Sequence, residues 1–159
     1  MKQKAFSLIE LMVVVAIIAF LASIAIPRYW KYHAKAKQAE VAMILSSLHT
    51  AEQAYYAEHE TYLTELSGPN GIGWQPEGYN NGGKNARFNY SYGFFFPGAQ
   101  EGVHYFTGKL ETKIDSGNCF ADKEKFLAKA AGDVIDKGKL DIWSIDESRD
   151  IKHEQNGID

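Results

Sequence analysis

One carboxylate interrupts the most apolar stretch of this 159-residue sequence. Glu10 lies within a run from Phe6 to Ile26 in which the remaining side chains are apolar except for Ser7 and Ser23. An acidic side chain inside a membrane costs on the order of a few kcal/mol, so residues of this kind are functional candidates. Because Glu10 is only one turn into the run, its carboxylate can also reach the membrane interface. That position explains how the charge is tolerated but not what it does.

A partner charge for Glu10 would arise if the chain were cleaved before Phe6. The new α-amine would then lie one helical turn from the carboxylate. The amine of one subunit could pair with Glu10 of a neighbouring subunit in an apolar setting of low dielectric, where pairing matters most. This hypothesis gives Glu10 a role in association between chains.

The run from Phe6 to Ile26 predicts a transmembrane helix. It would be about 31 Å long at about 1.5 Å per residue, which matches the roughly 30 Å hydrocarbon core of a bilayer. It is too long for an ordinary secretory signal, and no small-x-small cleavage site follows it. A buried core helix is the alternative, but few core helices are apolar on every face.

The stretch from Lys4 to Leu11, KAFSLIEL, resembles the prepilin processing motif of type IV pilins. The resemblance implies a leader peptide at residues 1–5, cleavage between Ala5 and Phe6 by a prepilin peptidase, and N-methylation of Phe6. It also implies that Phe6, Glu10 and Pro27 act in assembly. Ala5 departs from the family, which usually has glycine at this position.

A second departure from the family concerns the stability of the apolar helix. Ala19 stands where many pilins have a helix-weakening glycine. In assembled pili the helix is often partly unwound before the proline. Melting in this chain is therefore expected to depend mainly on Pro27, which lacks an N–H and clashes with the preceding turn.

Charged residues on the two flanks of residues 6–27, the predicted transmembrane and assembly helix, conflict with the family's topology. The leader contributes Lys2 and Lys4, whereas the other flank carries four basic residues: Arg28, Lys31, Lys35 and Lys37. Counting these charges disfavours a cytoplasmic leader. The resemblance nevertheless implies an inner-membrane precursor with a cytoplasmic N-terminus and a periplasmic head, followed by an extracellular pilus.

An amphipathic helix is predicted over residues 28–66, because apolar residues recur there at helical spacing. The stripe consists of Val41, Ile44, Leu45, Leu48, Ala51 and Tyr55, and the residues expected off the stripe are Lys35, Lys37, Glu40, Glu52 and Glu58. Residues 67–87 read as a loop held by Trp74 and Tyr79.

Residues 88–159 predict an antiparallel sheet and a C-terminal region. Strand patterns cover residues 88–96, 103–113 and 140–146, with a less regular one at 126–134. The overall prediction is the α+β type IV pilin fold, a long helix packed against a four-stranded antiparallel sheet. Cys119 is the single cysteine, so the C-terminal disulfide that the family usually has is absent. A looser C-terminal region is therefore expected.

Four carboxylates near the C-terminus form a weak candidate for a metal site: Asp133, Asp136, Asp141 and Asp146. Their oxygens suit calcium, but their spacing fits no EF-hand loop, and a polar turn between two strands is the simpler interpretation.

Scattered histidines and the absence of enzyme motifs predict no catalytic residue and no cofactor. The formal net charge of −3 offers no basic face for a nucleic-acid partner.

These features predict a structural subunit that polymerises into a type IV pilus serving motility, adhesion or DNA uptake. The implied partners are identical subunits in a helical filament, the peptidase and methyltransferase, the inner-membrane assembly platform with its ATPase, and membrane lipid before assembly. The alternatives are the major pseudopilin of type II secretion and an anchored binding domain that never polymerises.

Overall fold

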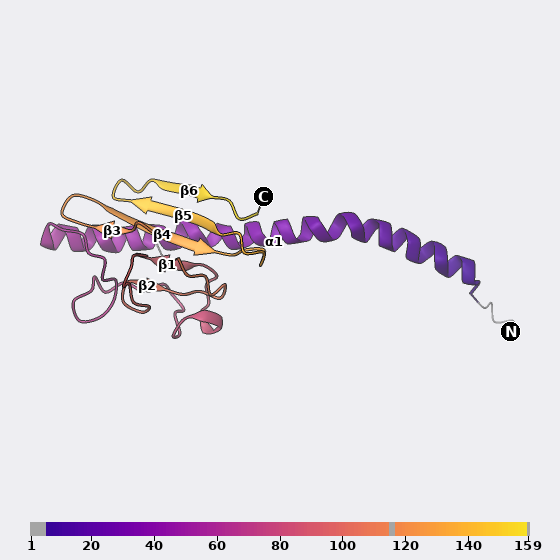
Figure 1. Ribbon diagram of the computed structural model, residues 1–159, viewed down its shortest axis with the longest axis horizontal. Coiled ribbons are helices and arrows are strands. Elements are labelled where there is room, and N and C mark those ends of the chain that lie inside the picture. Colours follow the sequence, from indigo (N-terminus) through magenta and orange to yellow (C-terminus); the bar gives the residue numbers. More distant parts are fainter. Residues whose placement is uncertain (1–5, 115–116, 159) are drawn as a thin grey trace. The chain divides into compact units, whose positions relative to one another are not determined.

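A computed structural model describes residues 6–114 and 117–158 of the chain (Figure 1). The leader peptide predicted at residues 1–5, including Ala5, lies outside the described residues. The chain divides into two compact units, with the boundary between His33 and Ala34. The unit that begins at Ala34 is the head unit.

Helix α1, Leu8–His59, has 52 residues and belongs to both units. Its first half is apolar on all sides, and the large apolar side chains from Phe6 to Ile26 are 45–79% exposed. An 18-residue window of α1 has a mean hydropathy of 2.8 and none of it is buried. By length and composition α1 can therefore cross a membrane, and the predicted long apolar N-terminal helix is confirmed.

Pro27 lies inside α1, and the helix continues through it. A proline in a helix interior removes one backbone hydrogen bond, yet the residues on both sides remain helical. Upstream, Ser23 Oγ donates a hydrogen bond of 2.7 Å to the carbonyl of Phe20. Melting near Pro27 stays a prediction for the assembled fibre.

The second half of α1 buries one face in the head unit. Val41, Leu45 and Leu48 are fully buried, as the apolar stripe predicts. Glu52 was expected off this stripe, and that expectation is wrong because its side chain is fully buried. Steps of four, three and four residues from Val41 lead to Glu52, so helical geometry places it on the buried face.

Helix α1 ends at His59, before the predicted boundary at residue 66. The Glu60 N–H donates the last helical hydrogen bond, to the Tyr56 carbonyl at 2.8 Å. Glu60 itself has a φ of 55°, and this left-handed conformation ends the helix. The chain beyond is tied to the head by Leu66, whose N–H donates to Val103.

The loop that follows is fixed by two aromatic residues, as predicted. Trp74 is buried, and its Nε1 donates to Ser47 Oγ at 3.1 Å. Trp74 and Tyr79 both make edge contacts with Phe106, at centroid distances of 5.8 and 4.7 Å. Later in the loop lies a single 3-10 turn, η1, Gly83–Asn85.

An antiparallel sheet of six strands follows in the described residues. The strands are β1 Ser91–Gly93, β2 Tyr105–Phe106, β3 Phe120–Ala121, β4 Phe126–Gly132, β5 Asp141–Asp146 and β6 Ile151–Gln155. The α+β prediction is confirmed, but the sheet has two strands more than predicted. Both missed strands lack a clear apolar alternation, because β3 has only two residues and β6 is mostly exposed.

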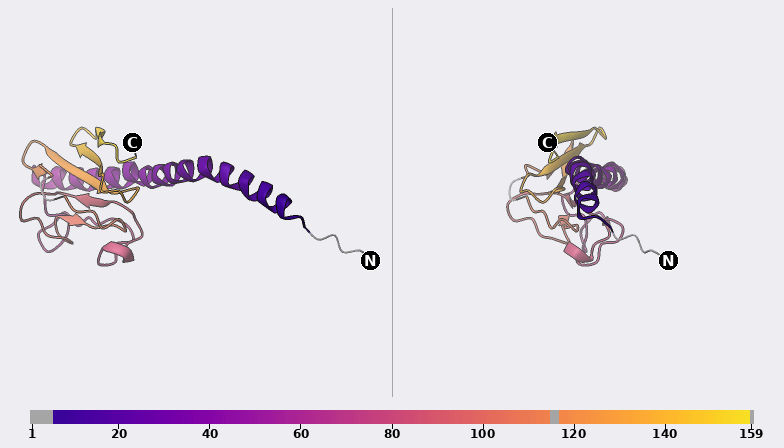
Figure 2. Two further views of the ribbon diagram at one scale, coloured as in Figure 1. Left: turned by 45° about the vertical axis from the view of Figure 1, so that its right-hand side comes forward. Right: turned by 90° about the vertical axis from the view of Figure 1, so that its right-hand side faces the viewer.

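The strand order is β2-β1-β4-β5-β6, and β3 also pairs with β4. This order differs from the predicted meander, because β1 pairs directly with β4. Figures 1 and 2 show β4 and β5 running alongside the C-terminal half of α1. Buried aromatic rings fill the core of the head unit, among them Tyr90, Tyr92, Phe94, Phe106 and Phe126.

Candidate functional site

Glu10 caps the N-terminus of its own helix. The Ser7 N–H donates to Glu10 Oε2 at 3.0 Å, and the Leu11 N–H donates to the Ser7 carbonyl at 3.3 Å. This is the glutamate arm of a Ser-x-x-Glu capping box. A carboxylate at this end of a helix is also stabilised by the helix dipole. Sequence analysis missed this local role, although the Ser-x-x-Glu spacing signals it.

Apolar side chains surround this carboxylate on one face of the helix. Phe6, Ile9, Val13 and Val14 line a shallow depression of about 370 Å³ together with Glu10. Spacings of three and four residues place them on the same face. Phe6 is 79% exposed. The depression is an apolar surface with one acidic group, suited to contact with lipid or with another apolar chain.

Only two of the residues predicted to act in assembly lie together. Phe6 and Glu10 share the depression. Pro27 is in the interior of α1, about 26 Å from Glu10 along the axis at about 1.5 Å per residue. Ala5 lies outside the described residues. The structure therefore groups the residues of the predicted charge pair and separates them from the proline.

A second carboxylate, Asp141 on β5, is fully buried and accepts five hydrogen bonds. The donors are the Tyr90 hydroxyl, Gln38 Nε2 at 2.9 Å, Trp143 Nε1 at 2.8 Å, His153 Nε2 at 2.8 Å and the Gly157 N–H at 2.9 Å. Burial alone would raise the pKa of Asp141, but the hydrogen bonds from its donors lower it overall. Asp141 on β5 thus links three other parts of the head: α1 through Gln38, the residue before β1 through Tyr90, and β6 through His153.

The Asp141 network explains how the C-terminal region is held without a disulfide. His153 on β6 and Gly157 beyond it both bind Asp141, and the His153 ring stacks on Trp143 at 3.9 Å. Ile158 is buried. Cys119 is a buried free thiol whose pKa is raised to about 11, mainly by burial. The described C-terminal residues are packed and hydrogen-bonded, which differs from the looser region expected.

The other candidate metal ligands are used mainly by turns. Asp133 accepts from the N–H groups of Lys137 and Gly138, and Asp146 accepts from two N–H groups in the next turn. Asp136 sits in the turn itself, with a φ of 53°. Within residues 6–114 and 117–158, no group of three or more His, Cys, Asp or Glu is arranged to hold a metal ion. The contacts favour the turn interpretation.

Two further carboxylates connect α1 to the head. Glu40 accepts from the Asn89 N–H at 2.6 Å, Asn89 Nδ2 at 2.8 Å and the Tyr92 hydroxyl at 3.2 Å. Glu52 accepts from the Leu63 N–H at 3.3 Å through Oε2, whereas its Oε1 has no partner among the described residues. Burial raises the pKa of Glu52 to about 8. The helical period signals Glu52, but no local pattern signals the role of Glu40.

Comparisons with known proteins agree with the N-terminal features. Residues 1–26 match the family described as the prokaryotic N-terminal methylation motif. The chain is 43% identical over 82 residues to the type IV major pilin protein PilA of Myxococcus xanthus, covering 52% of this chain and 36% of PilA.

Two further relatives match over shorter stretches. The chain is 42% identical over 57 residues to the type IV major pilin protein PilE1 of Neisseria gonorrhoeae, covering 36% of this chain and 34% of PilE1. It is 48% identical over 65 residues to a fimbrial protein of Pseudomonas aeruginosa, covering 41% of this chain and 42% of that protein. The chain thus spans roughly a third to two fifths of the length of these relatives. With its methylation motif, its similarity to major pilins over part of their length, its long N-terminal helix and its antiparallel sheet, the chain resembles the type IV pilins.

Proposed function

We propose that this protein is a structural subunit that polymerises into a type IV pilus. The observation that carries the proposal is the exposed apolar half of α1 with Glu10 on its surface. Such a surface is stable in lipid or in a bundle of like helices, but not in water. The relatives named above are pilins and a fimbrial protein, which supports a pilus subunit over a secretion pseudopilin.

Processing would prepare Glu10 for assembly. A prepilin peptidase cleaves between Ala5 and Phe6, and methylation of Phe6 leaves a positively charged amine. Glu10 Oε2 is used by the Ser7 N–H, whereas Oε1 makes no hydrogen bond within the described residues. One carboxylate can therefore cap its own helix and still pair with the amine of a neighbouring subunit. Pairing is strong in this setting because the surroundings are apolar.

Location follows from the same properties. The precursor is held in the inner membrane by the first half of α1, with its N-terminus in the cytoplasm and its head in the periplasm. Assembly by the inner-membrane platform and its ATPase moves this helix from lipid into the fibre, which becomes extracellular. The exposed heads then serve adhesion, motility or DNA uptake.

The proposal is tested by replacing Glu10 in the producing cell. Glu10→Val keeps an apolar helix surface and removes the charge pair. Losing one partner of a buried pair costs about 3–5 kcal/mol, so sheared fibres should fall at least about tenfold while the membrane still holds mature subunit. Glu58→Val is the matched control, because Glu58 is exposed on the same helix.

Two results would contradict this proposal. Normal amounts of fibre from the Glu10→Val strain would remove the role of the charge pair. Mass spectrometry of the mature chain should find methylated Phe6 at the N-terminus, and an intact Met1 in fibres would contradict the processing step. Absence of the chain from any sheared fibre, with normal membrane levels, would contradict polymerisation itself.

A further inference from the structure

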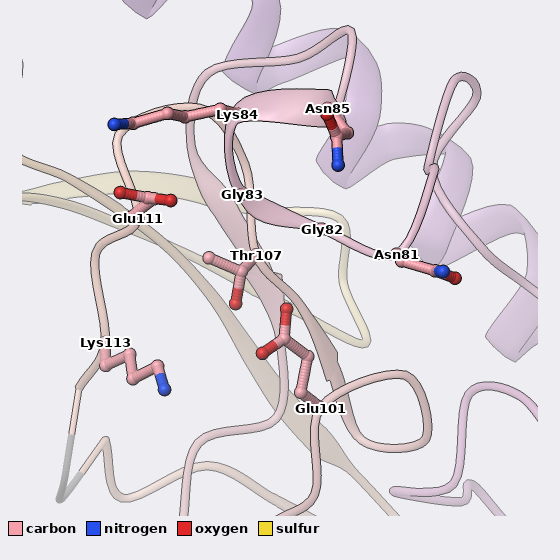
Figure 3. A pocket seen from close by; sticks show the side chains of 9 residues that line it. All are labelled: Asn81, Gly82, Gly83, Lys84, Asn85, Glu101, Thr107, Glu111 and Lys113. Carbon is pink, nitrogen blue, oxygen red and sulfur yellow. The ribbon is translucent and has the colours of Figure 1, made fainter.

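A polar crevice of about 440 Å³ opens in the head beside η1 (Figure 3). Its volume lies in the range of small-molecule sites, about 300–1,000 Å³. The crevice is lined by the turn of residues 81–85 and by four further residues: Glu101, Thr107, Glu111 and Lys113. All of these residues belong to the head unit, and none takes part in the proposed assembly surface.

The floor of the crevice carries a hydroxyl that no described residue satisfies. Thr107 is 3% exposed, and its Oγ1 has no hydrogen-bond partner in the described part of the chain. Its backbone carbonyl is used, since it accepts from the Gly83 N–H at 3.0 Å. Figure 3 shows the hydroxyl turned toward the space between Glu101 and Lys113. A buried polar group left unpaired costs about 1–3 kcal/mol, so a partner entering the crevice would relieve this cost.

The rim holds two acidic and two basic side chains that are exposed and unpaired within the described residues. These are Glu101, Glu111, Lys84 and Lys113. Figure 3 shows Glu101 and Glu111 on different sides of Thr107. Elsewhere in the head an equivalent pair is joined, with Lys129 Nζ 2.7 Å from Glu154 Oε2. The rim therefore presents separated donors and acceptors whose formal charges cancel.

Two successive glycines allow the carboxylates to approach the wall. Gly82 and Gly83 have φ values of 73° and 60°. A Cβ at Gly82 would collide with Glu101 Oε1, and one at Gly83 would lie 2.9 Å from Glu111 Oε1. Side chains at these positions would displace both acids from the rim. Because both residues are glycine, no side chain covers the backbone of the turn next to the two carboxylates.

We infer that this crevice is a binding site for an uncharged saccharide. The formal charges of the two carboxylates and two ammonium groups cancel, which favours neither an anion nor a cation, and Figure 3 shows the two carboxylates on different sides of Thr107. Carboxylates accept, ammonium groups donate, and the Thr107 hydroxyl does both. A sugar also carries several hydroxyls that both donate and accept, so it can satisfy all three kinds of group at once.

Saturation-transfer difference NMR on the full-length chain tests this inference. The chain is held in micelles of lauryldimethylamine oxide, because sugar-based detergents would compete with the probes. The probes are maltotriose, cellotriose and chitotriose, and transfer to at least one of them is expected. Thr107→Val should weaken that binding at least threefold. Because the substitution removes an unpaired buried hydroxyl, folding should be unchanged or stabilised. Thr50→Val is the matched control, since Thr50 is on α1 and bonds only to Ser46.

Three outcomes would overturn the inference. They are no transfer to any of the three sugars, transfer that Thr107→Val leaves unchanged, and calorimetric binding of Ca²⁺ at the crevice without saccharide binding. The measurement needs no fibre. Loss of saccharide binding and failure of the proposed polymerisation are therefore separate results.

Discussion

The two halves of α1 continue one helix but differ in what covers their side chains. Leu21 in the first half is 59% exposed, whereas Leu45 in the second half is fully buried. The head supplies its own partner for Leu45 through the sheet and its aromatic core. The side chain of Leu21 is mostly exposed among the described residues, and under the proposed function lipid or another chain would cover it. The two halves therefore differ in whether the chain itself buries their apolar side chains.

The carboxylates Asp141, in the head, and Glu10, on the apolar half of α1, also differ in their hydrogen bonding and burial. Asp141 in the head accepts five hydrogen bonds and is fully buried. Glu10 accepts one, from its own helix terminus, and stays on an exposed apolar face. The head satisfies the Asp141 carboxylate with donors of its own, whereas the Glu10 carboxylate on the apolar helix keeps one oxygen without a hydrogen bond among the described residues.

The largest effect on head stability is expected for Asp141→Ala. The change leaves the Tyr90 hydroxyl, the Gly157 N–H and other donors without an acceptor, and such losses in a buried charged network cost about 3–5 kcal/mol. Urea unfolding of the full chain in micelles, followed by near-ultraviolet circular dichroism, measures the change in free energy. Asp136→Asn is the control, because Asp136 is exposed at a positive φ that asparagine tolerates. Equal stability of the two variants would show that the network does not hold the head.

Truncating matched leucines compares the halves of α1 directly. Leu45→Ala should destabilise the head by about 2–5 kcal/mol, because it leaves a cavity in a packed core. Leu21→Ala should change head stability by less than about 0.5 kcal/mol, since Leu21 is largely exposed and lies outside the head unit. The same unfolding measurement applies. A comparable loss in both variants would contradict the independence of the two halves.

A smaller, pH-dependent effect is expected at Glu52. Its pKa is raised from 4.5 to about 8, so the unfolded chain loses the proton at lower pH than the folded chain does. The resulting penalty is absent below about pH 4.5, grows as pH rises and is complete above about pH 8. Glu52→Gln should remove this slope. The variant should gain on the order of 2 kcal/mol relative to the wild type between pH 5 and 8.

The exposed Glu58 offers the control for this titration. Glu58→Gln should keep the slope of the wild-type protein, because its side chain is not buried. Free energies of unfolding at several pH values measure all three proteins. If Glu52→Gln retained the full wild-type slope, another group would be responsible for it.

Much of the fold could be predicted from local patterns. The apolar run and the stripe at Val41, Leu45 and Leu48 predict α1, because helical spacing alone determines which residues share a face. The turn residues predict the loop around Trp74. Strands β3 and β6 could not be predicted, since both depend on pairing with β4 or β5 and have little pattern of their own.

The candidate sites divide in the same way. The motif around Phe6 and Glu10 is contiguous in sequence, so it can be recognised without a structure. The Asp141 network joins residues 12 to 103 positions apart, apart from its bond to Trp143. Hydrogen bonds over such separations leave no local signature. Asp141 is therefore predicted from sequence only as a strand residue and a weak metal-ligand candidate.

Local sequence is enough to establish the apolar span, the position of its one charge and the adjoining methylation motif, because each depends on neighbouring residues. Tertiary structure alone decides that Asp141 is a buried acceptor holding the C-terminal region, that Glu52 is buried, and that Thr107 faces a polar crevice. The physical reason is that desolvation and hydrogen bonding act between groups brought together only by folding.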